Sequence, residues 1–147
     1  MDTREILKIL KYIGVISFIL LVGYVLFPFI NGVGCDFRAQ FNDANISYYS
    51  TCKMGVATTI AKNNKTGEMI QYDGIYSKSG NTIRFFVFKI DELKEIRSID
   101  KDTINSLAKC HLYVMQIIVD EEHDWVVLSY PFPWIHKAKR IGKLGFW

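Results

Sequence analysis

The sequence has little of what most metal proteins and nucleic-acid-binding proteins display. Its 147 residues include three histidines, three cysteines and three prolines. The histidines and cysteines show none of the His-x-x-x-His, Cys-x-x-Cys or Glu-x-x-His spacings typical of metal sites. Glycine-rich phosphate loops are absent, and a net charge of +3 is too small to indicate nucleic-acid binding. We therefore expect no cofactor, no metal and no nucleic-acid partner.

Catalytic motifs are equally scarce. The stretch "STCK" at 50–53 has the Ser-x-x-Lys spacing of serine β-lactamases, and "KTG" at 65–67 matches their third motif. Only eleven residues separate the two, whereas in those enzymes the motifs lie far apart on a much larger fold. Chance explains the match better, so the sequence predicts a protein that is not an enzyme.

Apolar residues are abundant by contrast, and one long run dominates the N-terminal part. From Tyr12 to Ile30, nineteen residues carry no charged side chain. A helix of this length spans about 28 Å, close to the thickness of the hydrocarbon core of a bilayer. The run has no polar face, which disfavours a buried helix of a soluble domain. We predict a transmembrane helix over 12–30.

The charges that flank this run predict which side of the membrane the remaining chain occupies. Arg4, Lys8 and Lys11 precede the run, whereas no Lys or Arg follows it before Arg38. Positive charges mark the cytoplasmic side of a span. We therefore expect a cytoplasmic N-terminus over 1–11 and an extracytoplasmic domain over 31–147. In a bacterium, this is a single-pass protein of the inner membrane with a periplasmic domain.

The stretch "FPFINGVGCD" at 27–36 leaves three fates open for the span. Gly32 and Gly34 fit the small-x-small pattern of a cleaved signal, but the apolar run is longer than that of a signal peptide. Gly34 before Cys35 also resembles a bacterial lipoprotein signal, although Gly32 stands where a leucine-like side chain is usual. An uncleaved anchor is the favoured interpretation, and cleavage or lipidation of Cys35 are the alternatives.

The three cysteines, Cys35, Cys52 and Cys110, all lie beyond the span, in a compartment where disulfides form. Lipidation of Cys35 would leave the other two as a pair. Without it, a Cys35–Cys52 bond would close a short loop, and a Cys52–Cys110 bond would join the two halves of the domain. A longer loop constrains the unfolded chain more, so Cys52–Cys110 is preferred. Three unpaired cysteines are the alternative.

Short segments after the span predict β-strands. Within "EMIQYDGIY", Ile70 and Tyr72 alternate with Gln71 and Asp73, which indicates a half-exposed strand. Strands are expected over 55–62, 68–76, 82–90, 111–119 and 125–130. The last three are apolar on both faces, so we expect them to be covered on both sides.

One helix is expected between the strand groups. Asp100 or Asp102 can cap its N-terminus, and the helix would end at Lys109. The predicted fold class is therefore α+β. One N-terminal transmembrane helix precedes a small antiparallel sheet of five or six strands, with one or two short helices packed on a face.

An acidic segment and several aromatic residues are suited to a protein interface. The segment "DEEHD" at 120–124 is typical of a solvated hairpin tip between two strands. Aromatic side chains half-buried at a sheet surface are the alternative. The predicted partner-binding residues are Asp120, Glu121, Glu122, Asp124, Trp125, Tyr48 and Tyr49.

The C-terminal segment 131–147 combines basic and aromatic residues without one acid. Such a mixture suits the surface of an anionic bilayer. The alternative is a solvated basic tail whose aromatic side chains fold against the sheet. The predicted membrane-surface residues are Trp134, Lys137, Lys139, Arg140, Lys143 and Trp147.

These features together predict a membrane-anchored periplasmic module that binds another protein. An immunity or inhibitor protein against an envelope-directed toxin has this layout of one span, one compact domain and no catalytic motif. The alternative is an accessory single-span subunit of an envelope secretion or assembly complex. The expected partners are the lipid bilayer and a protein, either the toxin or a subunit of the complex.

Overall fold

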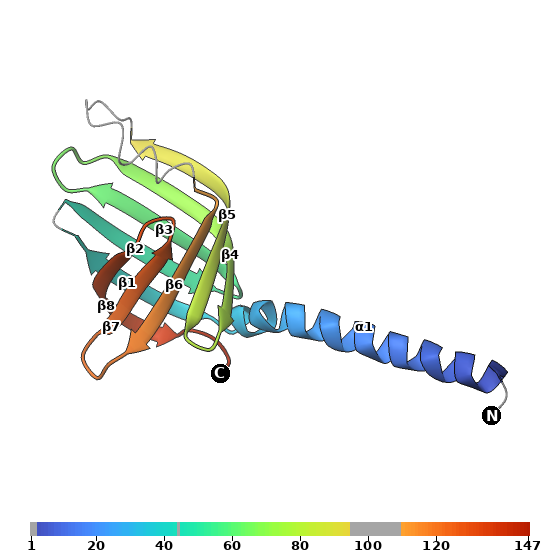
Figure 1. Ribbon diagram of the computed structural model, residues 1–147. Coiled ribbons are helices and arrows are strands. Elements are labelled where there is room, and N and C mark those ends of the chain that lie inside the picture. Colours follow the sequence, from blue (N-terminus) through green and yellow to red (C-terminus); the bar gives the residue numbers. More distant parts are fainter. Residues whose placement is uncertain (1–2, 44, 95–109) are drawn as a thin grey trace.

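The computed structural model describes residues 3–43, 45–94 and 110–147, and Figure 1 shows their arrangement. One long N-terminal helix, α1, runs from Thr3 to Val33. Eight strands follow it: β1 (Asp36–Asn42), β2 (Ile46–Lys53), β3 (Val56–Asn63), β4 (Met69–Ser79), β5 (Thr82–Lys94), β6 (Leu112–Val119), β7 (Asp124–Tyr130) and β8 (Trp134–Lys143).

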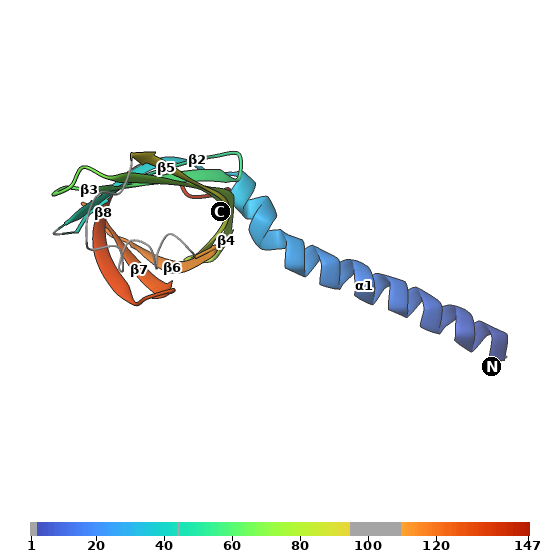
Figure 2. The same cartoon turned by 90° about the horizontal axis from the view of Figure 1, so that it is seen from above.

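The helix α1 has the length and composition of a membrane span. Its segment Ile9–Val33 is long and apolar enough to cross a membrane, and the chain buries none of its most apolar window. The helix leaves one side of the sheet domain and extends away from it in both views (Figures 1 and 2). The expectation of one apolar N-terminal helix followed by a sheet domain is therefore confirmed.

The strands form a closed barrel in chain order, which Figure 2 shows from above. Each strand pairs antiparallel with the next, and β8 returns to pair antiparallel with β1. The prediction of a sheet of five or six strands is wrong, because three unexpected strands, β1, β2 and β8, complete the circle. Closure gives every strand two neighbours, although β6 pairs only with the Thr82–Phe86 part of β5, while β4 pairs with β5 as far as Lys94.

The prediction of short helices packed on the sheet is also not borne out. Within the described ranges, α1 is the only helix. The helix expected from Asp100 or Asp102 to Lys109 falls outside the described residues. The element that covers part of the outer face of the barrel is the C-terminal part of α1, which packs against β4.

Strand β5 shows how closure changes the environment of an apolar strand. Phe85 and Val87 point into the barrel and are buried. Phe86 points outward and stacks on Phe29 of α1, with 5.7 Å between the ring centroids. Phe88 also points outward, and it is 62% exposed. The prediction that this strand is covered on both faces is wrong at Phe88, because α1 covers only one part of the outer surface.

The closing strands β1 and β8 alternate inward and outward side chains. In β1, Phe37, Ala39 and Phe41 are half-buried. Arg38 and Gln40, which alternate with them, are exposed. A glycine allows the final pairing: Gly142 has a φ of +101°, and a Cβ there would collide with the backbone oxygen of Asp36. Of the segment 131–147 predicted as a basic tail, Trp134–Lys143 is therefore a barrel strand.

The barrel has two ends that differ in structure. We call one end the proximal end. It carries Val33 of α1 and the β2–β3, β4–β5 and β6–β7 turns. The end that carries the β1–β2, β3–β4 and β7–β8 turns is the distal end. Because consecutive strands run in opposite directions, alternate turns fall at opposite ends.

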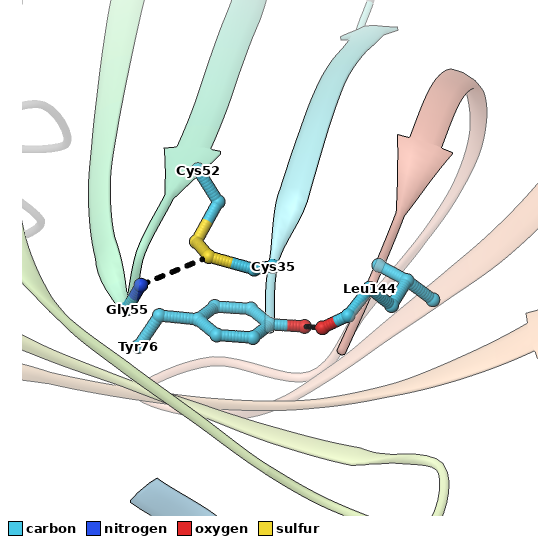
Figure 3. The surroundings of a disulfide bond; sticks show 5 residues. All are labelled: Cys35, Cys52, Gly55, Tyr76 and Leu144. Atoms are coloured by element: carbon cyan, nitrogen blue, oxygen red, sulfur yellow. Dashed lines mark hydrogen bonds between the residues drawn. A yellow bond between two sulfur atoms is a disulfide. The ribbon is translucent and has the colours of Figure 1, made fainter. Parts of the chain in front are cut away.

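A disulfide between Cys35 and Cys52 lies inside the proximal end, with 5.7 Å between the Cα atoms (Figure 3). The backbone N–H of Gly55 donates a hydrogen bond of 3.3 Å to Cys35 Sγ. The preferred pairing of Cys52 with Cys110 is wrong, because Cys110 immediately precedes β6 and therefore lies at the distal end. Since the disulfide uses the thiol of Cys35, it excludes lipidation of that residue in the same molecule.

Candidate functional site

The distal half of the barrel encloses a cavity of about 120 Å³. It forms because inward-facing residues near the distal ends of β1–β4 and β6–β8 leave a space that their side chains do not fill. Its aromatic lining consists of Phe41, Tyr48, Tyr72, Phe85, Tyr113, Trp134 and His136. The other lining residues are Ile46, Ser50, Thr59, Ala61, Asn63, Glu68, Ile70, Met115, Val126 and Leu128.

Small residues in β2 and β3 create the space. Tyr48 pairs in register with Ala61, and Ala61 pairs with Ile70 of β4. One step toward the proximal end, Ser50 pairs with Thr59, and their hydroxyl oxygens are 2.9 Å apart in a hydrogen bond. Because these two hydroxyl groups bond to one another, neither needs a hydrogen-bond partner from a ligand.

Aromatic rings gather on one side of the cavity around His136. Phe41 stacks on Tyr48 with 4.6 Å between the ring centroids and 14° between the planes. The His136 ring lies 5.6 Å from that of Phe41 and 6.4 Å from that of Tyr48. Trp134 meets His136 edge to face at 5.7 Å. Strands β1, β2 and β8 thus supply one continuous aromatic wall.

A second group of rings comes from β4, β5 and β6. The centroid of Tyr113 lies 6.1 Å from that of Tyr72 and 6.1 Å from that of Phe85. Burial raises the pKa of Tyr72 to about 12. Burial likewise raises the pKa of Tyr48 and of Tyr113 above the ordinary range. These hydroxyl groups are therefore neutral near pH 7 and keep a proton that they can donate.

Three polar groups of the cavity wall lack a hydrogen-bond partner among the described residues. They are both carboxylate oxygens of Glu68, the hydroxyl of Tyr48 and Nε2 of His136. Glu68 is only 4% exposed. Buried polar groups are nearly always hydrogen-bonded, and an unpaired buried carboxylate is especially costly. These unpartnered groups converge on one cavity, where a bound molecule could supply their hydrogen-bond partners.

The charged residues of the cavity lining are of one sign. Glu68 is the only Asp or Glu that lines the cavity, and the described lining contains no Lys or Arg. Along the chain, the basic residue nearest to Glu68 is Lys65, and the Nζ of Lys94 would lie 3.2 Å from a Cβ at Gly67. Lys94 is exposed at the end of β5 and does not line the cavity. The cavity therefore presents one carboxylate surrounded by rings.

The predicted partner-binding residues do not form one surface. Asp120, Glu121 and Glu122 are exposed in the β6–β7 turn at the proximal end. Tyr48 and Tyr49 occupy opposite faces of β2, so Tyr49 is exposed while Tyr48 lines the cavity at the distal end.

Asp124, the last residue of the predicted acidic tip, is not exposed with the others. Asp124 is 5% exposed and pairs with Arg140, whose Nη2 lies 3.3 Å from Asp124 Oδ1. The interpretation of Asp124 as a solvated interface residue is wrong, because its carboxylate is buried in this ion pair. Next to it, Trp125 is half-buried beneath the ammonium group of Lys137, which is 4.7 Å from the ring centroid.

The predicted membrane-surface residues are likewise divided, because their segment is a strand. Trp134 points into the distal cavity, and Arg140 is held by Asp124. Lys137 and Lys139 are exposed on the outer face of β8. Arg140, Lys143 and Trp147 line a second cavity of about 440 Å³ at the proximal end. The six residues therefore belong to several environments rather than to one docking surface.

Sequence reasoning missed Glu68 and His136 as site residues. The alternation of "EMIQYDGIY" carries a signal for the first, because Glu68 shares its parity with the inward Ile70 and Tyr72. The parity of "WIHK" likewise places His136 on the same face as Trp134. Among the described residues, no cluster of three or more His, Cys, Asp or Glu has the geometry of a metal site. Comparison of the chain with protein-family models, curated proteins and solved structures finds no match.

Proposed function

We propose that this protein is a membrane-anchored binding protein that holds a small ligand in the distal cavity of its barrel. The observation that supports the proposal is the set of unpartnered polar groups of Glu68, Tyr48 and His136 in an otherwise apolar cavity. Concave apolar sites with a few convergent polar groups are the usual form of small-ligand sites. A barrel of eight strands is also wide enough to hold one small ligand.

The location that we propose is the bacterial inner membrane, with the N-terminus in the cytoplasm and the barrel in the periplasm. The charge asymmetry around α1 supports this orientation. The disulfide supports it independently, because disulfides persist in the periplasm and are rare in the cytosol. A C-terminal alkaline phosphatase fusion should therefore be active, and the same fusion with a cytosol-dependent fluorescent protein should be dark. The opposite pattern would overturn the location.

The size of the cavity limits what it can hold. A dry cavity of about 150 Å³ in another protein holds benzene. The distal cavity, at about 120 Å³, is slightly smaller. We therefore propose that it receives either a compact ligand or one compact group of a longer ligand.

An immunity protein and an accessory envelope subunit are the two protein-binding functions predicted from the sequence, and both stay predictions. The residues expected to form the interface are divided between the outer surface, a buried ion pair and the cavity. For this reason we rank the binding of a small ligand above these two protein-binding functions. A variant with a filled cavity discriminates among the functions, because protection against a toxin should survive the filling if an outer surface carries it.

The direct test fills the cavity without touching its polar groups. Ala61→Phe places a ring in the cavity, and Ile60→Phe, one residue away on the outer face of β3, is the matched control. The full chain in maltoside micelles is screened by thermal shift against small cationic, neutral and anionic compounds. A ligand at about 100 times its Kd stabilises the folded state by about 2.7 kcal/mol.

We expect at least one class of compound to raise the Tm of the wild type and of Ile60→Phe but not that of Ala61→Phe. Native mass spectrometry of protein taken directly from membranes provides a second readout, since a retained ligand adds mass to the wild type and to Ile60→Phe but not to Ala61→Phe. Identical responses of wild type and a folded Ala61→Phe to every compound would overturn the proposal.

A further inference from the structure

We infer that the group bound in the distal cavity is an organic ammonium ion, held by the Glu68 carboxylate within a cage of aromatic rings. This inference rests on the proposed function and names the chemical class of its ligand. It follows from three properties of the site: the rings, the isolated buried carboxylate and the size of the space.

The rings provide the first argument. Phe41, Tyr48, Tyr72, Phe85, Tyr113 and Trp134 line a cavity of about 120 Å³ from six different strands. The face of an aromatic ring attracts a cation, and cages of several rings are the established device for recognising methylated ammonium groups. The attraction is larger where water is excluded, as it is for these largely buried rings.

The carboxylate provides the second argument. Glu68 is 4% exposed, and neither of its oxygens has a partner among the described residues. A neutral ligand could give Glu68 a hydrogen bond but would leave its charge uncompensated in an apolar space. An anionic ligand would add a like charge, and no Lys or Arg in the described lining would offset it. A cation satisfies both the charge of the carboxylate and the quadrupoles of the rings.

The two remaining polar atoms suit the rest of such a ligand. The hydroxyl of Tyr48 and Nε2 of His136 have no partner among the described residues, and their rings are 6.4 Å apart. A hydroxyl, ether or N–H group that neighbours the cationic centre can reach them. Since a cavity of about 150 Å³ holds the six carbons of benzene, the space fits a trimethylammonium group of about five heavy atoms.

The position of the cavity favours a ligand that is free in solution over a lipid headgroup. The cavity lies in the distal half of the barrel, and α1 joins the proximal end (Figure 1). The ammonium group of phosphatidylcholine and that of a free amine share the same chemistry, so the experiment includes both sources.

The test compares choline with 3,3-dimethylbutan-1-ol, which has the same shape with a neutral carbon in place of the cationic nitrogen. The full chain is placed in phosphatidylglycerol nanodiscs, and binding is followed by tryptophan fluorescence, to which Trp134 in the lining contributes. We expect choline to bind at least about tenfold more tightly than the alcohol, the size of effect that a desolvated cation–π site provides. Nanodiscs with added phosphatidylcholine form a separate arm, in which competition with choline identifies a headgroup as the source.

Two carboxylate variants locate the effect. Glu68→Gln keeps the shape of the side chain and removes its charge, and we expect it to lower choline affinity about tenfold and to leave the affinity of the alcohol unchanged. Glu122→Gln makes the same change in charge at an exposed residue of the proximal end and should alter neither affinity.

The outcomes separate the inference from the function on which it rests. Equal affinity for choline and the alcohol would overturn the inference and leave the binding function intact. Tighter binding of anionic compounds in the screen would do the same. Failure of every class of compound to bind the folded wild type would overturn both. The wild-type comparison decides the inference even if Glu68→Gln does not fold.

Discussion

The two ends of the barrel are built from the same strands, yet they differ in whether a large buried polar side chain is hydrogen-bonded. At the proximal end, Asn31 is 0% exposed, and its side chain takes part in four hydrogen bonds with backbone groups. At the distal end, Glu68 is 4% exposed, and its carboxylate has no hydrogen-bond partner among the described residues. The chain itself satisfies the side chain of Asn31, whereas it leaves the carboxylate of Glu68 without a partner.

Asn31 ties three segments together at the proximal end. Its Nδ2 donates to the carbonyl oxygens of Lys78 and Trp147, each at 3.2 Å. Its Oδ1 accepts from the backbone N–H groups of Phe146, at 2.9 Å, and Trp147, at 3.2 Å. The hydroxyl of Ser77 is the one buried polar side-chain atom near this junction that lacks a partner among the described residues. The last turn of α1, strand β4 and the segment after β8 are thus one packed unit.

This difference separates the contacts that stabilise the barrel from the proposed binding site. The disulfide, the Asn31 contacts and the Tyr76–Leu144 hydrogen bond all lie at the end that carries the helix. The aromatic cavity of about 120 Å³ and most of the unpartnered groups lie at the other end. Binding sites commonly retain costly groups that a ligand satisfies, and the surrounding structure must be stable enough to tolerate them.

Removing the disulfide at the proximal end should cause the largest loss of stability. Cys35→Ala combined with Cys52→Ala opens a loop with a sequence separation of 17 residues. Loops of about this size contribute about 3 kcal/mol to the free energy of unfolding. Urea unfolding of the full chain in micelles, followed by tryptophan fluorescence, measures the loss. Cys110→Ala, outside the disulfide, is the control, and an equal loss in that variant would contradict the assignment.

Removing the Asn31 side chain tests the same end at a smaller scale. Asn31→Ala is expected to lower the free energy of unfolding by about 2 kcal/mol, since it leaves buried backbone groups unpaired. Hydrogen exchange at the amides of Phe146 and Trp147 should become faster, because both donate to Asn31. Asn81→Ala, at an exposed residue of the β4–β5 turn, provides the matched control. Unchanged exchange at both amides would refute the described junction.

A pair of matched tyrosine variants sharpens the comparison between the ends. The Tyr76 hydroxyl donates a hydrogen bond of 2.9 Å to the carbonyl oxygen of Leu144 (Figure 3). Tyr76→Phe should therefore lower the free energy of unfolding by about 1 kcal/mol. Tyr48→Phe removes a buried hydroxyl that has no partner among the described residues, so the ligand-free protein should keep or gain stability. Destabilisation by both variants to the same extent would remove the distinction.

The last effect appears only at alkaline pH. The pKa of Tyr72 rises from 10.0 to about 12 on folding, chiefly because the ring is buried. A raised folded-state pKa stabilises the fold below the unfolded value, and the contribution is lost as the pH rises from 10 toward 12. Tyr72→Phe should therefore lose less stability than the wild type over this interval, whereas the exposed control Tyr49→Phe should follow the wild type. Parallel curves for Tyr72→Phe and wild type would contradict the described burial.

Local patterns in the sequence were sufficient for the helix and for most of the strands. The uncharged run from Tyr12 to Ile30 falls wholly within α1, and the alternation of Ile70 and Tyr72 with Gln71 and Asp73 gives β4 its inward face. Neither pattern depends on distant residues. For this reason both could be interpreted before the fold was known.

Closure and the site could not be predicted in this way, because both depend on contacts between distant segments. The pairing of β1 with β8 joins Asp36 to Lys143, and the basic character of β8 concealed its alternation. The partnership between Asn31 and Trp147 likewise links residues 116 positions apart. The inward direction of Glu68 was readable from its parity, but a charged residue beside a predicted turn gives no reason to expect burial.

The short connection between α1 and the barrel also governs how the protein faces its surroundings. Only Gly34 and Cys35 lie between the end of α1 and the start of β1, and Cys35 is fixed by its disulfide. The barrel therefore cannot swivel freely relative to α1. Under the proposed membrane location, the tilt and rotation of α1 in the lipid would set the direction in which the distal cavity faces, and copies in one membrane would share that orientation.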